Sequence, residues 1–454
     1  MPLKTSNSGD WPPGPAIGLA GWGLFRRMSR DMLTTLAEWR EQYGSVFHVR
    51  VWPEHIVVVA NPILARELLL THHSSLSRWE RGIDVFEQIH GKSVLIVEGE
   101  RWTQKRRSLQ SYFSPKSVRN NHELILAAVK NALIKWPKTD PEWHIESALT
   151  ALTMEVIMRA MFSASSDEEN RKAAQAVYIA SQAANAEFFA IAGWPSYLSG
   201  KKRKAIQYLK KLIDRYIETR LQLSKEEWPE DFLSHLLLLQ QDDPEQWSHK
   251  AIRDECMTMF LAGHETTAAT LTWWVWCMAA NPDHQEKSRE EVSRVLQGAL
   301  PTHEQLAELP YLSQTVEETM RLYPAAPLLM TRRALAPVSL GSWSFPARTL
   351  FMIPLQLIQT DAQWYSPPQQ YCPEHFKKDT KTTPRGAYAP FGMGPRVCLG
   401  QHFAMAEIKV IAAILLQHWR FFIPTGAQPP KPILRVTLRP DYPLRLGLTA
   451  LRTL

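Results

Sequence analysis

The chain has 454 residues. This length is enough for a large core and exceeds the usual size of a single domain, so two lobes are expected. Hydrophobic residues make up 45%, which fits a soluble globular protein, and the four cysteines are too scattered to form a disulfide framework. The net charge of +7 comes without a recognisable nucleic-acid-binding motif, which argues against a nucleic-acid partner.

The N-terminal part mixes helices and strands. Residues 11–15 are a proline-rich, extended lead-in, and the apolar run after them is too short to span a bilayer. The hydrophobic pattern then predicts a helix over 28–43, strands at Val46–Val51 and His55–Val59 around a Trp52-Pro53 turn, and a helix over 62–71.

Residues from about 100 to 325 are predicted to be almost entirely helical, with breaks at Gly193–Ser196 and Trp228-Pro229. Near the start of this region, Trp102 and Arg106 are four residues apart and share a helix face. An indole N–H and a guanidinium side by side can both donate to a carboxylate. Packing in a core is the ordinary alternative for Trp102.

A long apolar run from Met257 to Ala280 is interrupted by His264 and Glu265, so it is predicted to be a buried core helix and not a membrane span. Its centre reads Ala262-Gly263-His264-Glu265-Thr266-Thr267. Small residues let a helix pass close to a flat cofactor, and a threonine within a helix can bond back to a carbonyl. The acid and the alcohol of Glu265 and Thr266 can together relay protons.

Further along, Glu318 and Arg321 share one face of a helix that ends near Pro324. Strand patterns return between 330 and 357, and an irregular proline-rich stretch follows over 361–390. The C-terminal runs Ile433–Leu438 and Leu444–Leu448 predict a hairpin around Pro440-Asp441.

The segment from Phe391 to Gly400 has the sequence Phe-Gly-Met-Gly-Pro-Arg-Val-Cys-Leu-Gly and predicts a rigid, tightly turned loop. A helix is expected directly after it, from Gln401 to about Trp419. A cysteine before a helix feels the positive end of the helix dipole, which favours the thiolate. Cys398 is therefore suited to ligate a soft metal, with Arg396 as a nearby cation.

Three other interpretations of this loop were weighed. A dinucleotide fingerprint lacks its third glycine, because Val397 stands there. Cys398 and His402 could form a nucleophile–base pair, although such a histidine is more often helix surface. A zinc site needs about four ligands, and no second cysteine lies nearby.

The pattern Phe-x-x-Gly-x-Arg-x-Cys-x-Gly resembles the haem-binding loop of the cytochrome P450 family, and the other motifs follow in that family's order over most of the chain. The resemblance implies a mainly α fold with small β regions, with haem b between an α-rich lobe and a smaller β-containing lobe. The whole of 1–454 would be one catalytic domain, in which residues 45–60, 330–357 and 432–450 form the strand-rich lobe.

The resemblance also implies roles for individual residues. Cys398 would ligate the iron, and Glu265 with Thr266 would form the oxygen-activating segment. Glu318 and Arg321 would form a structural network with His375, where the family usually has arginine, so this network would depend more on pH. The remaining cofactor-binding positions are Trp102, Arg106, Ala262, Phe391, Arg396, Gly400 and either Arg332 or Arg333.

The implied reaction is insertion of one oxygen atom of O2 into an organic substrate. Electrons would come from NAD(P)H through a reductase and a separate acidic partner of the ferredoxin or flavodoxin type, docking near Lys105, Arg107 and Lys409. A solvated surface is the ordinary alternative for these charges. No membrane span is expected, and a cytoplasmic, bacterial-type enzyme is predicted.

An apolar or aromatic substrate is expected, because the residues predicted to line the pocket are largely apolar. They are Thr258, Leu261, Ala262, Thr266, Leu328, Leu329 and Met330. Phe188, Phe189 and Trp194 would belong to a lid or simply to the core. Oxidative coupling, ring formation, desaturation, a peroxide-driven reaction and a non-catalytic haem-thiolate sensor remain as alternatives.

Overall fold

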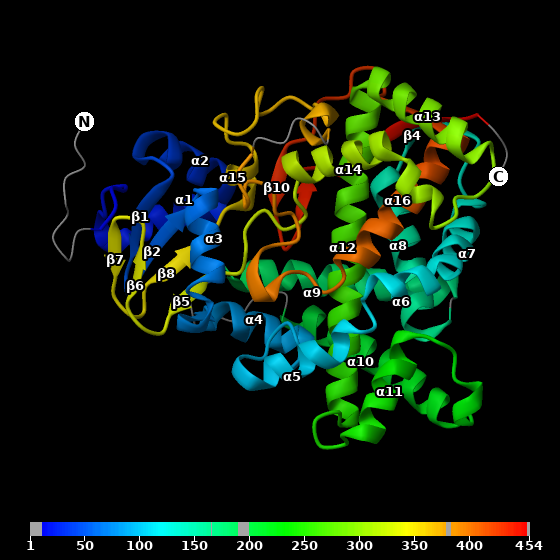
Figure 1. Ribbon diagram of the computed structural model, residues 1–454, viewed down its shortest axis with the longest axis horizontal. Coiled ribbons are helices and arrows are strands. Elements are labelled where there is room, and N and C mark those ends of the chain that lie inside the picture. Colours follow the sequence, from blue (N-terminus) through cyan, green and yellow to red (C-terminus); the bar gives the residue numbers. More distant parts are fainter. Residues whose placement is uncertain (1–10, 165, 189–198, 378–382, 452–454) are drawn as a thin grey trace. The chain divides into compact units, whose positions relative to one another are not determined.

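A computed structural model describes residues 11–164, 166–188, 199–377 and 383–451. The chain divides into two compact units. Unit 1 comprises 1–84, 320–398 and 432–439, and unit 2 comprises 85–319, 399–431 and 440–454. The fold is mainly helical with small sheets, as the sequence predicts (Figure 1).

Unit 1 is organised around a five-stranded sheet with the order β1-β2-β8-β5-β3. Strands β1 and β2 form an antiparallel hairpin in which Val46 lies opposite Val59, and β2 pairs with β8 in parallel. The strands of this sheet are β1 (Val46–Val51), β2 (Glu54–Val59), β3 (Leu76–Arg78), β5 (Arg332–Ala334) and β8 (Leu350–Met352). Unit 1 also contains two separate strand pairs. One pair is β6 (Val338–Leu340) with β7 (Trp343–Phe345), and the other is β10 (Pro432–Leu434) with β11 (Leu438–Pro440).

Three helices of unit 1 contact the first two strands of this sheet. Two helices stand where one was predicted over 28–43, because Asp31 is extended and its side chain caps the second helix by accepting from Thr34 N at 3.1 Å. They are α1 (Trp22–Arg30) and α2 (Met32–Tyr43). The other helical elements of unit 1 are α3 (Pro62–Leu70), α15 (Leu355–Gln359) and the short turns η1 (Leu19–Gly21), η2 (His73–Ser75), η5 (Pro373–Phe376) and η7 (Gly394–Arg396). The division between the units crosses α4 (Glu80–His90), α14 (Pro310–Leu322) and β11.

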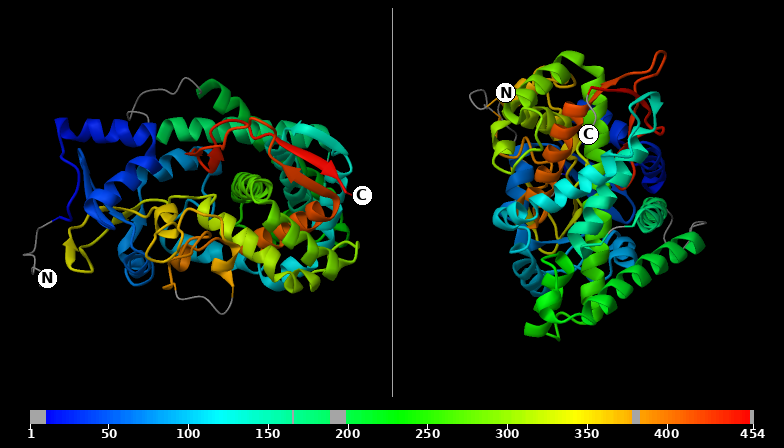
Figure 2. Two further views of the ribbon diagram at one scale, coloured as in Figure 1. Left: turned by 90° about the horizontal axis from the view of Figure 1, so that it is seen from above. Right: turned by 90° about the vertical axis from the view of Figure 1, so that its right-hand side faces the viewer.

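Unit 2 is built from helices that pack around α12 (His249–Ala280), which Figure 2 shows nearly end-on in its left view. Most of α12 is buried, which confirms the prediction of a core helix. Helix α12 packs against α8 (Ile145–Phe162), α9 (Asp167–Phe188), α10 (Ser199–Leu221), α11 (Phe232–Asp242), α13 (Pro282–Leu296) and α16 (Gln401–His418). Unit 2 also contains α5 (Gly99–Gln110), α6 (Pro115–Asn120), α7 (His122–Leu133) and the short turns η3 (Lys225–Glu227) and η4 (Gln305–Glu308).

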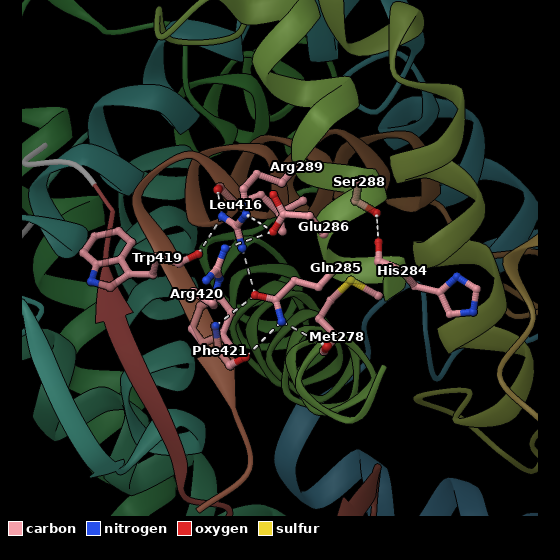
Figure 3. A network of polar contacts seen from close by, with 10 residues as sticks. All are labelled: Met278, His284, Gln285, Glu286, Ser288, Arg289, Leu416, Trp419, Arg420 and Phe421. Carbon is pink, nitrogen blue, oxygen red and sulfur yellow. Dashed lines mark hydrogen bonds and ion pairs between the residues drawn. The ribbon is translucent and has the colours of Figure 1, made fainter. Parts of the chain in front are cut away.

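A polar network fixes the end of α16 (Figure 3). The last carbonyls of a helix have no partner within that helix and must be satisfied from outside. Arg289 of α13 donates to the carbonyls of Leu416 and Trp419. Gln285 donates to Phe421 O at 2.9 Å and accepts from Phe421 N at 2.9 Å. These bonds tie α13 to the junction of α16 and β9.

The C-terminal strands pair differently from the prediction. Strand β12 (Leu446–Ala450) lies between β4 (Thr139–Trp143) and β9 (Trp419–Phe422) in unit 2. The predicted hairpin of Ile433–Leu438 with Leu444–Leu448 is therefore wrong, and the strand-rich lobe does not include β12. Among the described residues, no helix is both long enough and apolar enough to cross a membrane. Phe189, Trp194 and the predicted break at Gly193–Ser196 lie outside the described residues.

Candidate active site

The cysteine loop of unit 1 is held by close backbone contacts. Gly392 and Gly394 have φ of 81° and 77°, in the left-handed region that favours glycine. A Cβ on Gly394 would lie 2.4 Å from the carbonyl oxygen of Leu69, so α3 leaves no room for a side chain there. Cys398 N donates to Phe391 O at 2.9 Å, which closes the loop. The rigid loop that the sequence predicted is therefore present.

Cys398 differs from the other cysteines in its exposure. Cys398 is exposed and Cys372 is half-buried, whereas Cys256 and Cys277 are buried. Burial raises the pKa of the Cys256 and Cys277 thiols, since a thiolate loses its solvation in an apolar core. Neither buried cysteine suits ligation of a metal as a thiolate. The geometry leaves Cys398 as the accessible thiol.

The segment before β5 lies beside this loop. A Cβ on Gly392 would stand 3.5 Å from Leu329 Cδ2, so Leu329 and the loop are neighbours. Leu329 also packs on the apolar core of unit 1. Leu328 forms a bridge with Pro354, and the Met330 sulfur accepts from Arg78 at 3.8 Å. All three predicted pocket residues are half-buried.

The two adjacent arginines of β5 have different surroundings. Arg333 is buried and forms ion pairs with Glu54 at 2.6 Å and Glu80 at 2.8 Å. These carboxylates raise the pKa of Arg333, so it is fully committed as a structural cation. Arg332 is half-buried and donates to Met330 O. Arg332 is therefore the better candidate for an external carboxylate.

Arg321 is fully buried in unit 1 and satisfies backbone carbonyls. It donates to Gln359 O at 3.0 Å and Pro368 O at 2.7 Å, and its guanidinium lies 4.7 Å from the Tyr365 ring. His375 meets the edge of the same tyrosine, with ring centroids 5.5 Å apart. Arg321 and His375 thus gather around Tyr365, which the sequence analysis did not single out. Glu318, one turn before Arg321 on α14, is also fully buried.

In unit 2, the predicted oxygen-activating segment lies at the middle of α12. Thr266 Oγ1 donates to Ala262 O at 2.6 Å, as expected for a threonine within a helix. Glu265 is half-buried, and its Oε2 accepts from Ser181 Oγ of α9 at 2.6 Å. Sequence reasoning missed Ser181 because α9 carries no motif at that position. Helix α12 continues through the segment without a break.

The accessible residues at this point of α12 follow helical spacing. They are Met259, Ala262, Gly263, Glu265 and Thr266, and they interrupt a helix that is otherwise mostly buried. Thr258 is instead held by Ser93 Oγ at 2.6 Å and His90 Nδ1 at 3.2 Å, and Leu261 is buried too. The accessible face is therefore rotated relative to the predicted one, and it includes Met259.

Gly263 has a packing reason that the sequence did not reveal. A Cβ at this position would lie 2.8 Å from Ile157 Cδ1 of α8. The glycine therefore allows α8 and α12 to approach closely. A close approach to a flat cofactor is not needed to explain it.

Helix α5 carries the predicted donor pair of unit 2. The Arg106 guanidinium lies 5.8 Å from the Trp102 ring, and both side chains are half-buried. Lys105, expected on a docking surface, is instead buried and pairs with the fully buried Glu255 of α12 at 2.7 Å. Glu255 also accepts from Val94 N at 3.0 Å. The prediction for Lys105 is wrong, whereas Arg107 is exposed as expected.

Behind the segment, Glu407 of α16 is buried against α12. Burial raises the pKa of Glu407, while a hydrogen bond from Thr267 opposes the shift. Its Oε1 atom has no partner among the residues that the structure describes. His402 lies on the exposed surface of α16, and Lys409 is half-buried.

A cleft of about 450 Å³ in unit 2 is a poor candidate for an apolar substrate. It is lined by cations such as Arg101 and Lys250 and by carboxylates such as Asp243 and Asp254. Apolar ligands prefer pockets with few polar groups.

An exposed thiol in a rigid glycine loop, in a mainly helical protein, is the arrangement expected of a protein that ligates a metal through a thiolate. The cytochrome P450 family model matches residues 12–447, and the chain belongs to the cytochrome P450 family. It is accordingly a haem-thiolate monooxygenase that uses O2, haem and an electron-donating partner.

Curated plant proteins resemble the chain over most of its length. A cytokinin hydroxylase of Arabidopsis thaliana is 28% identical over 92% of this chain and 84% of its own length. The Arabidopsis protein LUTEIN DEFICIENT 5 is 29% identical over 90% of this chain and 72% of its own. The Arabidopsis carotene epsilon-monooxygenase is 25% identical over 84% of this chain and 75% of its own.

Proposed function

We propose that this monooxygenase oxidises an apolar organic substrate with electrons from a separate acidic protein, and that Cys398 holds its haem. The observation that carries the proposal is the exposure of Cys398 in a loop fixed by Gly392 and Gly394. The haem supplies the redox chemistry with O2. The donor set fits such a group, because a soft thiolate and several cations match iron and the haem carboxylates.

The residues that would hold the haem carboxylates are cationic or donate through nitrogen. In unit 1 these are Arg332 and Arg396, with Arg333 excluded because its ion pairs to Glu54 and Glu80 already occupy it. In unit 2 they are Trp102 and Arg106.

Proton handling is proposed for Glu265, Ser181 and Thr266. Ser181 Oγ gives its hydrogen bond to Glu265 Oε2, so it holds this carboxylate in one orientation. Thr266 Oγ1 donates its hydrogen bond to Ala262 O, so its lone pairs are left to accept a hydrogen bond from the reacting groups. Glu265 would then supply the proton. A positioned proton donor contributes typically about 10²–10⁴-fold in rate.

An apolar substrate is supported by the accessible stripe of α12, where Met259 and Ala262 precede Thr266 on one face of the helix. In unit 1, Leu328 and Met330 are half-buried and apolar as well. The relatives are named for a cytokinin and for a carotene, so their names do not agree on one substrate. We therefore propose only the substrate class.

The electron donor is proposed to be an acidic ferredoxin or flavodoxin-type protein. The chain carries a net charge of +7, and Arg107 is exposed on α5. Lys105 does not contribute, since its ammonium is buried against Glu255. Complementary charge would steer the encounter, and this attraction would weaken as salt rises.

The test measures NAD(P)H-driven O2 consumption and product formation with surrogate redox proteins and a set of apolar compounds. Wild type is expected to consume O2 in a substrate-dependent way. Thr266→Ala should still consume reductant but form less product per electron and more peroxide, whereas Thr266→Ser should restore coupling. Ser181→Ala should weaken coupling to a smaller extent, because Glu265 keeps its carboxylate but loses its orientation.

Full coupling in Thr266→Ala would contradict the role of the threonine. Reaction with peroxide but not with O2 and reductant would instead indicate a peroxide-driven enzyme. Haem absorbance of each variant checks that it still binds its cofactor.

A further inference from the structure

The polar cleft of about 450 Å³ in unit 2 is lined by two stretches of the chain. One comes from residues 92–105, which lead into and begin α5, and we call it the α5 wall. The other comes from residues 243–254, which lead into and begin α12, and we call it the α12 wall. The two walls are far apart in sequence, so the cleft is a product of the fold that no motif predicts.

The α5 wall is cationic. Its charged lining residues are Lys92, Arg101 and Lys105, and no carboxylate lines this wall among the residues that the structure describes. Lys105 is committed to its buried ion pair with Glu255. Lys92 and Arg101 are exposed, and neither forms an ion pair with any described residue. Two positive charges of the α5 wall are therefore available to a ligand.

The α12 wall is mainly acidic. Its carboxylates are Asp243, Glu245 and Asp254, and Lys250 is the one cation among the described residues that line it. Asp243 Oδ1 accepts a hydrogen bond from Gln246 N at 3.0 Å, which fixes this carboxylate at the start of the wall. Glu245 is exposed and forms no ion pair within the part of the chain that the structure describes. The excess charge of this wall is negative.

Buried side chains hold the two walls in place. Asp254 is buried, and its Oδ2 accepts from Lys92 N at 2.9 Å, so a direct bond ties one wall to the other. Gly91 permits this bond, because its φ is 60° and a Cβ there would lie 2.1 Å from the Asp254 carboxyl carbon. The Lys105 ammonium lies 4.7 Å from the ring of the buried Trp247. The cleft is therefore formed before any ligand binds, which lowers the cost of binding.

The opposite charges of the two walls face the same cleft without meeting. Neither Lys92 nor Arg101 forms an ion pair with a carboxylate of the α12 wall. A ligand with a single charge would be attracted by one wall and repelled by the other. A ligand with a carboxylate at one end and an ammonium at the other would instead form charge-assisted hydrogen bonds with both.

We propose that this cleft binds a zwitterionic small molecule of the amino-acid or short-peptide class. The ligand's carboxylate would accept hydrogen bonds from Lys92 and Arg101. Its ammonium would donate to Asp243 and Glu245. The bound molecule would thus bridge the beginnings of α5 and α12. The site lies wholly within unit 2 and does not depend on the proposed reaction or its substrate.

The experiment is calorimetric titration of the haem-loaded protein with ε-aminocaproate, a zwitterion whose charges stand at opposite ends of a flexible chain. Caproate lacks the ammonium and hexylamine lacks the carboxylate, so they are the matched ligands. Wild type is expected to bind ε-aminocaproate about ten-fold more tightly than either, because a hydrogen bond to a charged group is worth roughly that factor. The midpoint of thermal unfolding should rise with ε-aminocaproate, since a ligand that binds the folded state stabilises it.

Two double variants each neutralise one wall. Lys92→Gln/Arg101→Gln removes the available cations of the α5 wall, and Asp243→Asn/Glu245→Gln removes two carboxylates of the α12 wall while keeping polar side chains. Each should weaken binding of ε-aminocaproate about ten-fold or more. Haem absorbance verifies that every variant folds and holds its cofactor.

Lys116→Gln/Lys130→Gln is the matched control, because it removes two exposed cations that do not line the cleft. It should bind ε-aminocaproate like wild type. Equal binding of caproate and ε-aminocaproate would show that the ammonium is not recognised and would overturn the proposal. So would a wild type that binds no ε-aminocaproate, or wall variants that bind it unchanged. A shift of the Soret band that both wall variants retain would place the compound at the haem and equally overturn it.

Discussion

At the scale of single residues, Glu407 is an acid in an apolar environment. Its carboxyl is fully buried, and burial raises its pKa well above the ordinary value. A carboxyl whose pKa is raised on folding favours the folded state most at low pH, and this contribution is lost as pH rises from the unfolded pKa towards the folded one. The neutral acid is therefore the form that suits the core.

Glu407→Gln is expected to be stabilised relative to wild type by an amount that grows with pH above about 4.5. The increase should approach roughly 1.4 kcal/mol per pH unit until the folded pKa is reached. Denaturant unfolding of both proteins between pH 5 and 8 measures it, and the exposed Glu41→Gln is the control. A stability difference that is constant across this range would contradict a protonated Glu407.

Sequence reasoning succeeded at residues whose chemistry is local. The back-bond of Thr266 depends only on a residue four positions earlier, and the glycine loop around Cys398 depends on backbone angles that few other residues adopt. It failed where a distant partner decides the role. Lys105 was expected at the surface, but Glu255, 150 residues away, holds it in the core.

At the scale of elements, the Lys105–Glu255 pair joins α5 to α12 within unit 2. Both side chains are buried, and the Lys105 ammonium also lies 4.7 Å from the Trp247 ring. Burial raises the pKa of Glu255, and Lys105 opposes that rise. Removing the cation would leave a buried carboxylate without its counter-charge, which is costly.

Lys105→Met is therefore expected to lower the free energy of unfolding by about 3–5 kcal/mol, the usual cost of breaking a buried ion pair. Arg107→Glu, two residues away and exposed, should leave stability within about 0.5 kcal/mol. It should instead slow electron delivery by an acidic partner and reduce the dependence of that rate on salt. Unfolding curves and electron-transfer rates of both variants distinguish a structural role from a role in docking the electron donor. A stable Lys105→Met that loses the salt dependence would restore Lys105 to the docking surface.

The elements themselves show which sequence signals are reliable. The long apolar pattern predicted α12, and the turn at Trp52-Pro53 predicted the β1–β2 hairpin. The C-terminal strands were predicted to exist but were paired wrongly. Strand β12 pairs with β4, about 300 residues earlier, and periodicity carries no information on such distant partners.

At the scale of the whole molecule, the family follows from motifs spread along the chain and agrees with a family match over 12–447. The division into two compact units was expected from length, and each unit draws on segments far apart in sequence. The substrate does not follow in the same way, because specificity depends on a few side chains whose positions the motifs do not determine.

The ligation of haem by Cys398 is the central claim, and the spectrum of the reduced protein with carbon monoxide tests it most directly. Wild type should show the red-shifted Soret band of thiolate ligation, and Cys398→Ser should lose it. Cys372→Ser, a change at the half-buried cysteine, should keep the band. If Cys398→Ser retained the thiolate band, another residue would hold the iron and the account of this site would be wrong.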